Sequence, residues 1–322
     1  MKITQLSFHA VIAIAFVCMS LESVEAQTAA PKSLEVREAS KKANEPTPSK
    51  KPVAETVSVK SEIQLNKAAN GKNYLLSYKL QANQKIVSEV IHLATTNTKI
   101  NDVSQSSKSR TVSSKVWDVK SVDSSGNMAF TQSVASVDMS QQVADASEVR
   151  YNSATDNEAP SAFKTVAETI GKPLATITIT PWGEVTDRSE KANGGNLGMG
   201  DITIPMPKEA IDIGQQWETD REIRVRRPDG SPKVVKVREL YKLEKVSAGV
   251  AVINIRSEPL TPLREPEVEA QAIQQMSDGE ARFDIDAGRL ISKSLAWDKT
   301  VVGFSGAGSV MEYSARLDEK VQ

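Results

Sequence analysis

The sequence predicts an α+β protein that is mostly β, built from long antiparallel strands in one or more curved sheets, with one short helix in each half. Apolar and polar residues alternate along many stretches from Asn73 onward, which is the period of a half-buried strand. Aromatic residues make up 5% of the chain and hydrophobic residues 39%, which suits a core of Val, Ile and Thr better than a Leu-rich helical bundle. A helical period appears only twice.

The first 26 residues predict an export signal. Lys2 supplies a positive start, the stretch 8–19 is almost continuously apolar, and Val24-Glu25-Ala26 places small residues where a signal peptidase reads them. We therefore expect cleavage between Ala26 and Gln27. The mature chain would have 322 − 26 = 296 residues and be periplasmic or extracellular.

Two alternatives to cleavage stay open. An uncleaved membrane anchor needs about 20 apolar residues, whereas this run is shorter, contains His9 and is followed by Glu22 and Glu25. A lipid anchor on Cys18 is the second alternative, although Val17 stands where Gly, Ala or Ser is usual. Cys18 is the one cysteine of the sequence, so the cleaved chain forms no disulfide.

Residues 27–60 are predicted to form a disordered tether. The segment holds four prolines among Lys, Glu, Ala and Ser, and it has no aromatic residue. Such a composition buries too little apolar surface to offset the entropy of ordering. Its seven basic and four acidic residues leave two interpretations, a spacer or a weak electrostatic attachment to anions of the cell envelope.

The first β-rich half is expected to span residues 61–192. It begins with a strand that places Tyr74, Leu76, Tyr78 and Leu80 on one face and Ser77 and Lys79 on the other. Further strands are predicted at 86–100, 116–122 and 128–139, the last two joined by the turn 123–126. A helix at 159–170 ends at Gly171 and Pro173, and a hairpin follows around 181–183.

A Gly- and Pro-rich linker is predicted at 193–207, followed by a second β-rich half at 208–322. Strands are expected at 216–227, 234–244 and 250–256, with the turn 228–231 between the first two. A helix at 265–276 precedes a hairpin of 281–285 and 290–302, and 303–317 is the last strand. Both halves thus run from strands to a helix and a hairpin, which permits a tandem repeat, either as two sheets or as one curved sheet.

The residues that carry catalysis in common enzymes are sparse. His92 is the one histidine after the predicted signal, and neither Gly-x-Ser-x-Gly nor His-Glu-x-x-His occurs. A Ser–His–Asp triad around His92 stays open, but a structural or surface residue of a strand is the preferred interpretation. The sequence therefore assigns no catalytic, cofactor-binding or metal-binding residue, and no cofactor.

Two motifs resemble known ligand loops only in part. Asp284-x-Asp286-x-Gly288 resembles the start of a calcium loop, but Leu295 stands where an EF-hand needs Glu, so a hairpin turn is the preferred interpretation. The stretch 193–200 is rich in glycine but lacks the Gly-Lys-Ser/Thr of a phosphate loop, and we interpret it as a flexible connection.

Charge patterning gives one local feature and no global one. Forty basic residues oppose 41 acidic ones, so no overall field favours nucleic acid. No apolar run after the signal is long enough for a membrane span. The turn 228–231 is flanked by seven cations, which predict either an anion-binding hairpin or a charged sheet edge; they are Arg221, Arg224, Arg226, Arg227, Lys233, Lys236 and Arg238.

The four tryptophans are Trp117, Trp182, Trp217 and Trp297. We expect core roles for them rather than a stacking platform for a flat ligand. Trp217 and Trp297 in particular share strand parity with apolar residues, which predicts buried faces for both.

Three sequence motifs resemble those of an uncharacterised family of secreted bacterial proteins, which is known only as a domain of unknown function. They are Trp117-x-Val119-x-x-Val122-Asp123-x-x-Gly126, Pro205-x-Pro207 followed by Ile211-x-x-Gly214-x-x-Trp217, and Phe283-Asp284-x-Asp286-x-Gly288-Arg289-Leu290. The resemblance covers about 73–317, departs from the expected Pro-Gly turn at Asn83-Gln84, and carries no catalytic residues. Long strands backed by helices are also similar in architecture to the half-barrels of lipoprotein-localisation factors, which hold acyl chains.

Three functions follow as hypotheses. The first is an exported, non-catalytic envelope or extracellular domain that binds a hydrophobic or acyl ligand, with a lipid or envelope component as partner and no nucleic acid. The second is a structural or scaffolding envelope protein with no small ligand. The third is a hydrolase that uses carboxylates alone, as glycosidases do.

Overall fold

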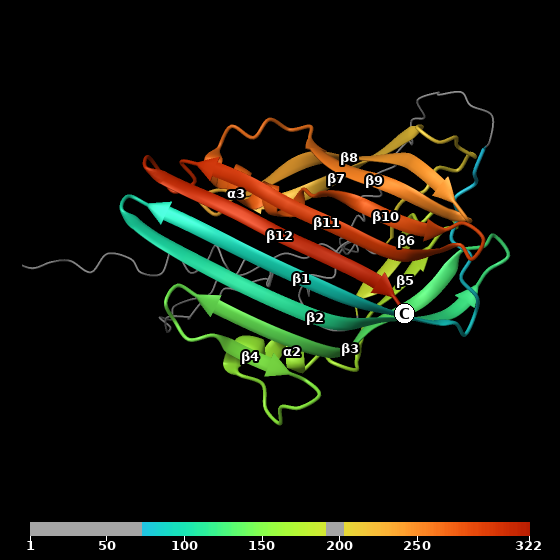
Figure 1. Ribbon diagram of the computed structural model, residues 1–322, viewed down its shortest axis with the longest axis horizontal. Coiled ribbons are helices and arrows are strands. Elements are labelled where there is room, and N and C mark those ends of the chain that lie inside the picture. The colour runs from blue at the N-terminus through green and yellow to red at the C-terminus, as the bar shows by residue number, and fades with distance from the viewer. Residues whose placement is uncertain (1–72, 191–202) are drawn as a thin grey trace, which may run out of the picture. The chain divides into compact units, whose positions relative to one another are not determined.

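The computed structural model describes residues 73–190 and 203–322 and is mostly β (Figure 1). The described strands are β1 (Lys85–Ile100), β2 (Val103–Val122), β3 (Met128–Val143), β4 (Val149–Asn152), β5 (Pro173–Ile179), β6 (Val185–Glu190), β7 (Gln216–Arg226), β8 (Pro232–Ser247), β9 (Val250–Pro259), β10 (Asp278–Asp284), β11 (Arg289–Val302) and β12 (Ser309–Val321). The short helices are α2 (Lys164–Ala167) and α3 (Pro266–Ala272), next to the 3₁₀ turns Ser161–Phe163 and Ile273–Gln275.

All twelve strands belong to one open, curled sheet in the order β6-β5-β3-β2-β1-β12-β11-β10-β9-β8-β7, with β4 paired to β3. The pairings are antiparallel, and β1 lies against β12 from Ser88–Val321 to Ile100–Ser309 (Figure 1). This pairing of the first strand with the last joins both halves. Of the two arrangements that the sequence left open, the molecule therefore adopts the single curved sheet.

The strands are long because tight turns hold their registers. Ile100 pairs with Val103, so β1 and β2 are joined by two residues, and Asn101 has the positive φ of 54° that such a turn requires. Asp123 closes the β2–β3 turn, where its Oδ1 accepts hydrogen bonds from the Ser125 and Asn127 amides. The predicted hairpins of both halves are confirmed.

Three buried apolar clusters lie on one face of the sheet, which we call the inner face. On β12, Met311 belongs to one cluster and Leu317 to another, and their even spacing of six residues places both on the same side. On β3, Phe130 and Val134 connect the first cluster to the third in the same way. The helix α3 covers the inner face of the second half, and α2 covers β3 and β5 in the first half.

The predicted strand from Asn73 is not a strand. Residues 73–84 run as an extended segment across the inner face, where Leu76, Tyr78 and Leu80 are buried as predicted, but Ser77 is buried as well. The segment forms no ladder because turns of the sheet satisfy its amides: Tyr78 N donates to Pro181 O at 2.7 Å, and Lys79 N donates to the Gly288 carbonyl at 2.9 Å. We call it the crossing segment.

Glycine is required where the crossing segment touches the two turns. A Cβ at Gly183 would lie 2.7 Å from the Tyr78 ring, and a Cβ at Gly288 would lie 2.5 Å from the Lys79 side chain. Both glycines also have positive φ, which other residues adopt at a cost.

Three further element boundaries differ from the predictions. The expected helix at 159–170 is α-helical only at Lys164–Ala167, and the one at 265–276 ends in a 3₁₀ turn after Ala272. The last strand starts at Ser309 rather than 303, because Gly303, Gly306 and Gly308 all have positive φ and form a turn. A 3₁₀ turn at the end of a helix is common, so the second helix, which is helical from Pro266 through Gln275, lies close to its predicted bounds.

Candidate functional site

Several predicted features lie outside the described residues. They are the cleavage position Ala26–Gln27, the tether at 27–60, and the glycine-rich stretch 193–200. Of the predicted linker, Thr203–Pro207 is described: Ile204 and Met206 are buried in the first apolar cluster. In the described parts of the chain, no helix is long and apolar enough to cross a bilayer.

His92 lies on the inner face of β1, opposite Thr111 of β2 and Leu317 of β12. Its ring meets that of Trp297 edge to face, with centroids 6.3 Å apart. Burial lowers the pKa of His92 below its ordinary value, since a charged imidazolium loses solvation there. None of these three neighbours carries a carboxylate.

The calcium-like motif forms the β10–β11 turn. Asp284 Oδ1 accepts a hydrogen bond from the Ala287 amide at 2.8 Å. The Gly288 carbonyl accepts a hydrogen bond from Lys79 N of the crossing segment. No group of three metal-ligating side chains occurs among residues 73–190 and 203–322. The motif thus acts in the structure as a turn.

The basic hairpin lies at the sheet edge, because β7 is the terminal strand. Arg221 Nε lies 2.7 Å from a Glu239 oxygen, and Arg238 reaches both Glu218 and Asp220 at about 3 Å. Arg227 and Lys233 pair with Glu265. The hairpin is therefore a charged edge whose cations are largely matched by carboxylates.

The tryptophans differ in burial. Trp217 is fully buried, and its Nε1 donates to the Pro205 carbonyl at 2.7 Å, which confirms its core role. Trp297 lies on the inner face as predicted but is only partly buried. Trp117 is also partly buried and stacks on Phe130 at a centroid distance of 4.4 Å. Trp182 is partly exposed in the β5–β6 turn.

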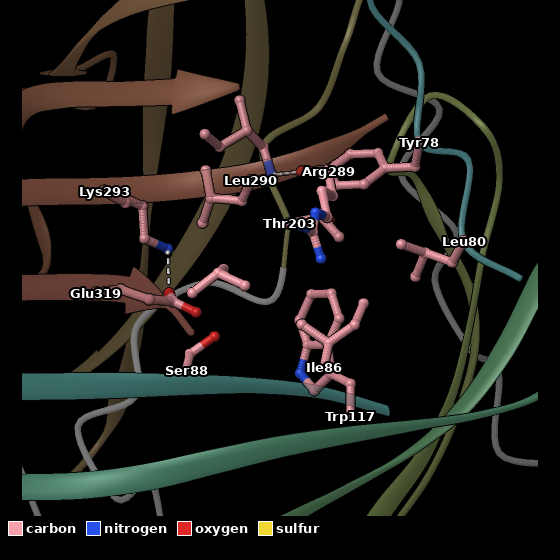
Figure 2. A pocket seen from close by; sticks show the side chains of 12 residues that line it. Tyr78, Leu80, Ile86, Ser88, Trp117, Thr203, Arg289, Leu290, Lys293 and Glu319 are labelled. Atoms are coloured by element: carbon pink, nitrogen blue, oxygen red, sulfur yellow. Dashed lines mark hydrogen bonds and ion pairs between the residues drawn. The ribbon is translucent and has the colours of Figure 1, made fainter. Parts of the chain in front are cut away.

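A pocket opens on the inner face beside Trp117, and it is the strongest candidate site (Figure 2). Its lining comes from the crossing segment, the starts of β1 and β11, the end of β12, and the segment after residue 202. The lining residues are Tyr78, Leu80, Ile86, Ser88, Trp117, Thr203, Ile204, Arg289, Leu290, Lys293, Glu319 and Val321. The empty space at the pocket, including open solvent at its mouth, amounts to about 420 Å³.

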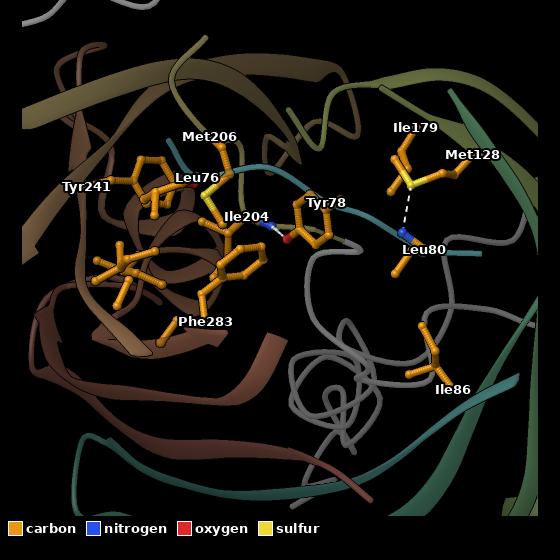
Figure 3. Packing of buried hydrophobic residues seen from close by; sticks show 14 of the residues in the cluster. Leu76, Tyr78, Leu80, Ile86, Met128, Ile179, Ile204, Met206, Tyr241 and Phe283 are labelled. Atoms are coloured by element: carbon orange, nitrogen blue, oxygen red, sulfur yellow. Dashed lines mark hydrogen bonds between the residues drawn. The ribbon is translucent and has the colours of Figure 1, made fainter. Parts of the chain in front are cut away.

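The crossing segment forms one wall of this pocket. Tyr78 Oη accepts a hydrogen bond from the Ile204 amide at 2.9 Å, and Leu80 N points at Met128 Sδ at 3.3 Å (Figure 3). Tyr78 also meets Phe283 edge to face at 5.2 Å, and its burial raises its pKa above the ordinary range. The segment thus lies between the β3–β5 side chains of the first half and those of β10 in the second.

One end of the pocket is polar, because four adjacent strands place hydrophilic side chains on the inner face. Lys115 of β2 is opposite Ser88 of β1, and Lys293 of β11 is opposite Glu319 of β12. Lys115 forms a short ion pair with Glu319, and Lys293 Nζ lies 3.7 Å from its Oε2. Each of these three charged side chains is at most 4% exposed. We call Lys115, Lys293 and Glu319 the buried charge cluster.

The protonation of this cluster follows from its surroundings. Burial is the largest influence on Glu319 and opposes its charge, but Lys115 and Lys293 and the hydrogen bonds from Lys115 and Ser88 outweigh it, so its pKa lies below the ordinary value. Burial lowers the pKa of Lys115, and only part of that effect is reversed by Glu319. The carboxylate is therefore firmly charged, while an ammonium beside it is stabilised by any further anion.

One donor near the cluster lacks a partner among the described residues. The indole Nε1 of Trp117 is buried and makes no hydrogen bond there. In Figure 2 this nitrogen is on the side of the ring that faces Ser88. A buried N–H without an acceptor costs free energy, so an acceptor brought by a ligand would be favourable.

Sequence reasoning missed this site although a signal was present. Lys293 is an even number of residues from Leu295 and Trp297, so all three are expected on the same face of their strand. Lys115 has the same relation to Trp117 and Val119. A lysine at an inward position of an otherwise apolar face is unusual, because burying its charge requires a partner.

No known protein family, curated protein or solved structure matches this chain. The resemblance to secreted bacterial proteins of unknown function therefore stays a prediction, and the geometry of the pocket carries the functional argument.

Proposed function

We propose that the protein is an exported, non-catalytic envelope or extracellular domain whose inner-face pocket binds a hydrophobic or acyl ligand. The observation that carries the proposal is a pocket whose walls are mainly apolar and whose one end is a buried, hydrogen-bonding charge cluster. Such a combination is typical of sites that hold a small amphipathic molecule in a fixed orientation.

The architecture supports the same proposal. The curled sheet and the crossing segment enclose Leu80, Ile86, Leu290 and Val321 around one space.

The two other hypotheses have less support. Among the described lining residues Glu319 is the one carboxylate, and it is held by two lysines. A glycosidase uses two carboxyl groups about 5–10 Å apart with separate protonation states. A scaffolding protein would not need a pocket with a buried polar end, and it is distinguished by the absence of ligand binding.

Binding of N-phenyl-1-naphthylamine, an uncharged fluorescent amphiphile, tests the proposal. We expect saturable fluorescence enhancement with the purified protein and its loss, by tenfold or more in affinity, in Leu290→Trp, which fills the pocket. Leu75→Trp is the matched control, because Leu75 is 47% exposed and does not line the pocket. Equal binding by both variants, or no saturable binding at all, would contradict the proposal and favour the scaffold.

A further inference from the structure

The buried charge cluster sits where no requirement of the fold explains it. It lies in the middle of the sheet, on β2, β12 and β11, between apolar clusters on the same face. Burying an ion pair rarely stabilises a protein relative to apolar side chains of similar size. The cluster therefore calls for a role other than stability, and it lies at one end of the pocket.

The charges of the site are unequal. Among the described residues that line the pocket, Arg289 and Lys293 are cationic and Glu319 is anionic. Lys115 is not part of the lining but pairs with Glu319. Lys115 Nζ also lies 5.2 Å from the centroid of the Trp117 ring, so the ammonium and the indole face a common space. An additional anion at this end would meet ammonium groups and the Trp117 N–H.

We propose that the ligand of this pocket is a monoanionic amphiphile, with its carboxylate bound by Lys115, Lys293 and Trp117 Nε1 and its chain directed along Ile86, Leu290 and Val321. The inference rests on the proposed function and adds the chemistry of the head group. A carboxylate brings one charge and two acceptor oxygens, which match ammonium and indole donors.

Other head groups fit less well. A phosphate monoester carries about −1.5 to −2 charges and three strong acceptors, and Glu319 would repel it more strongly than it repels a carboxylate. An amine would pair with Glu319 but would be repelled by both lysines. An uncharged alcohol would leave the ammonium groups without the additional anion.

Displacement of N-phenyl-1-naphthylamine by four sixteen-carbon amphiphiles tests the proposal: palmitic acid, hexadecanol, hexadecylamine and hexadecyl phosphate. We expect palmitate to displace the probe at about tenfold lower concentration than hexadecanol, since hydrogen bonds to charged groups contribute on that scale. In Trp117→Phe, palmitate affinity should fall about tenfold while hexadecanol affinity stays unchanged. Phe retains the stacking on Phe130, so the variant is expected to fold.

Two controls isolate the head-group site. Trp297→Phe removes another buried indole N–H without a partner among the described residues, but outside the pocket lining, and should leave both affinities unchanged. Lys120→Met removes an exposed lysine of β2 and should also change neither, whereas Lys115→Met should abolish the preference for the acid.

The outcomes separate the two proposals. Equal displacement by acid and alcohol would overturn the head-group inference and leave apolar binding intact. Stronger displacement by the amine would also overturn the inference, because it would mean that Glu319 binds the head group. Stronger displacement by the phosphate would overturn it in favour of a ligand with a larger anionic head group. If neither the probe nor any amphiphile binds, the proposed function itself fails.

Discussion

The molecule contains two groups of opposed charges with very different surroundings. In the buried charge cluster, Lys115 and Glu319 are 3% and 4% exposed. On the β7–β8 hairpin, Arg238 and its partner Asp220 are 33% and 44% exposed. The residue types are similar, and both groups lie on long antiparallel strands. The first group is shielded from solvent, whereas the second is exposed to it.

This difference decides what each group does for the protein. Exposed pairs contribute little because water and salt screen them, so the hairpin charges mainly keep an edge strand soluble. Buried charges lose hydration that only close partners replace, so removal of one partner is costly. The hairpin is prominent in the sequence because of its seven cations, yet the head-group site that we propose lies at the two lysines inside the sheet.

The largest effect is expected for Glu319→Met, which leaves Lys115 and Lys293 facing each other inside the sheet. The free energy of unfolding should fall by about 3–5 kcal/mol, because two buried ammonium groups lose their shared carboxylate. Urea denaturation measures it. Glu312→Met, on the exposed face of the same strand, is the control and should change stability by less than about 0.5 kcal/mol. Similar values for both variants would remove the contrast between buried and exposed charge.

Lys115→Met should cost less, about 1–3 kcal/mol, because Lys293 remains 3.7 Å from Glu319 and continues to neutralise it. Urea denaturation of Lys115→Met beside Lys120→Met gives the comparison within one strand. A loss equal to that of Glu319→Met would mean that Lys293 does not support the carboxylate, contrary to the observed geometry.

His92 extends the comparison to pH. Its pKa in the folded protein lies below the ordinary 6.5, because burial disfavours the imidazolium. The unfolded chain therefore takes up a proton first as pH falls, and stability that is complete above pH 6.5 decreases below it. We expect thermal unfolding of His92→Gln to lose part of this acid dependence. An identical pH profile in both proteins would place the titration elsewhere.

The smallest effect is expected at the hairpin. Arg238→Ala should cost at most about 1 kcal/mol, although Arg238 contacts both Glu218 and Asp220. The loss should also shrink in 1 M NaCl, where the Debye length is about 3 Å, whereas the loss in Glu319→Met should persist. A salt-resistant loss of several kcal/mol at Arg238 would show that the hairpin charges are not screened as their exposure implies.

Much of the fold could be predicted because its information is local. Alternation and turn residues predicted β1, β3, β7 and the hairpins of both halves, since strand period and turn geometry depend on neighbouring residues. The Ser-rich first part of β2, Val103–Lys115, was missed, because its pairing with β1 and not its own pattern makes it a strand. The crossing segment was predicted as a strand for the opposite reason: its apolar and polar residues alternate in sequence, but its amides bond to turns.

The sequence by itself determined that the chain is a mostly β protein with long strands and two short helices. Only the tertiary structure decided that the halves share one sheet, through the pairing of β1 with β12. In this pairing Asn97 lies opposite Glu312, which is 215 residues away in the sequence. The same pairing brings Ser88 and Lys115 of the first half next to Glu319 and Lys293 of the second. Contacts between residues so distant in sequence depend on sheet order and register, which no local pattern encodes.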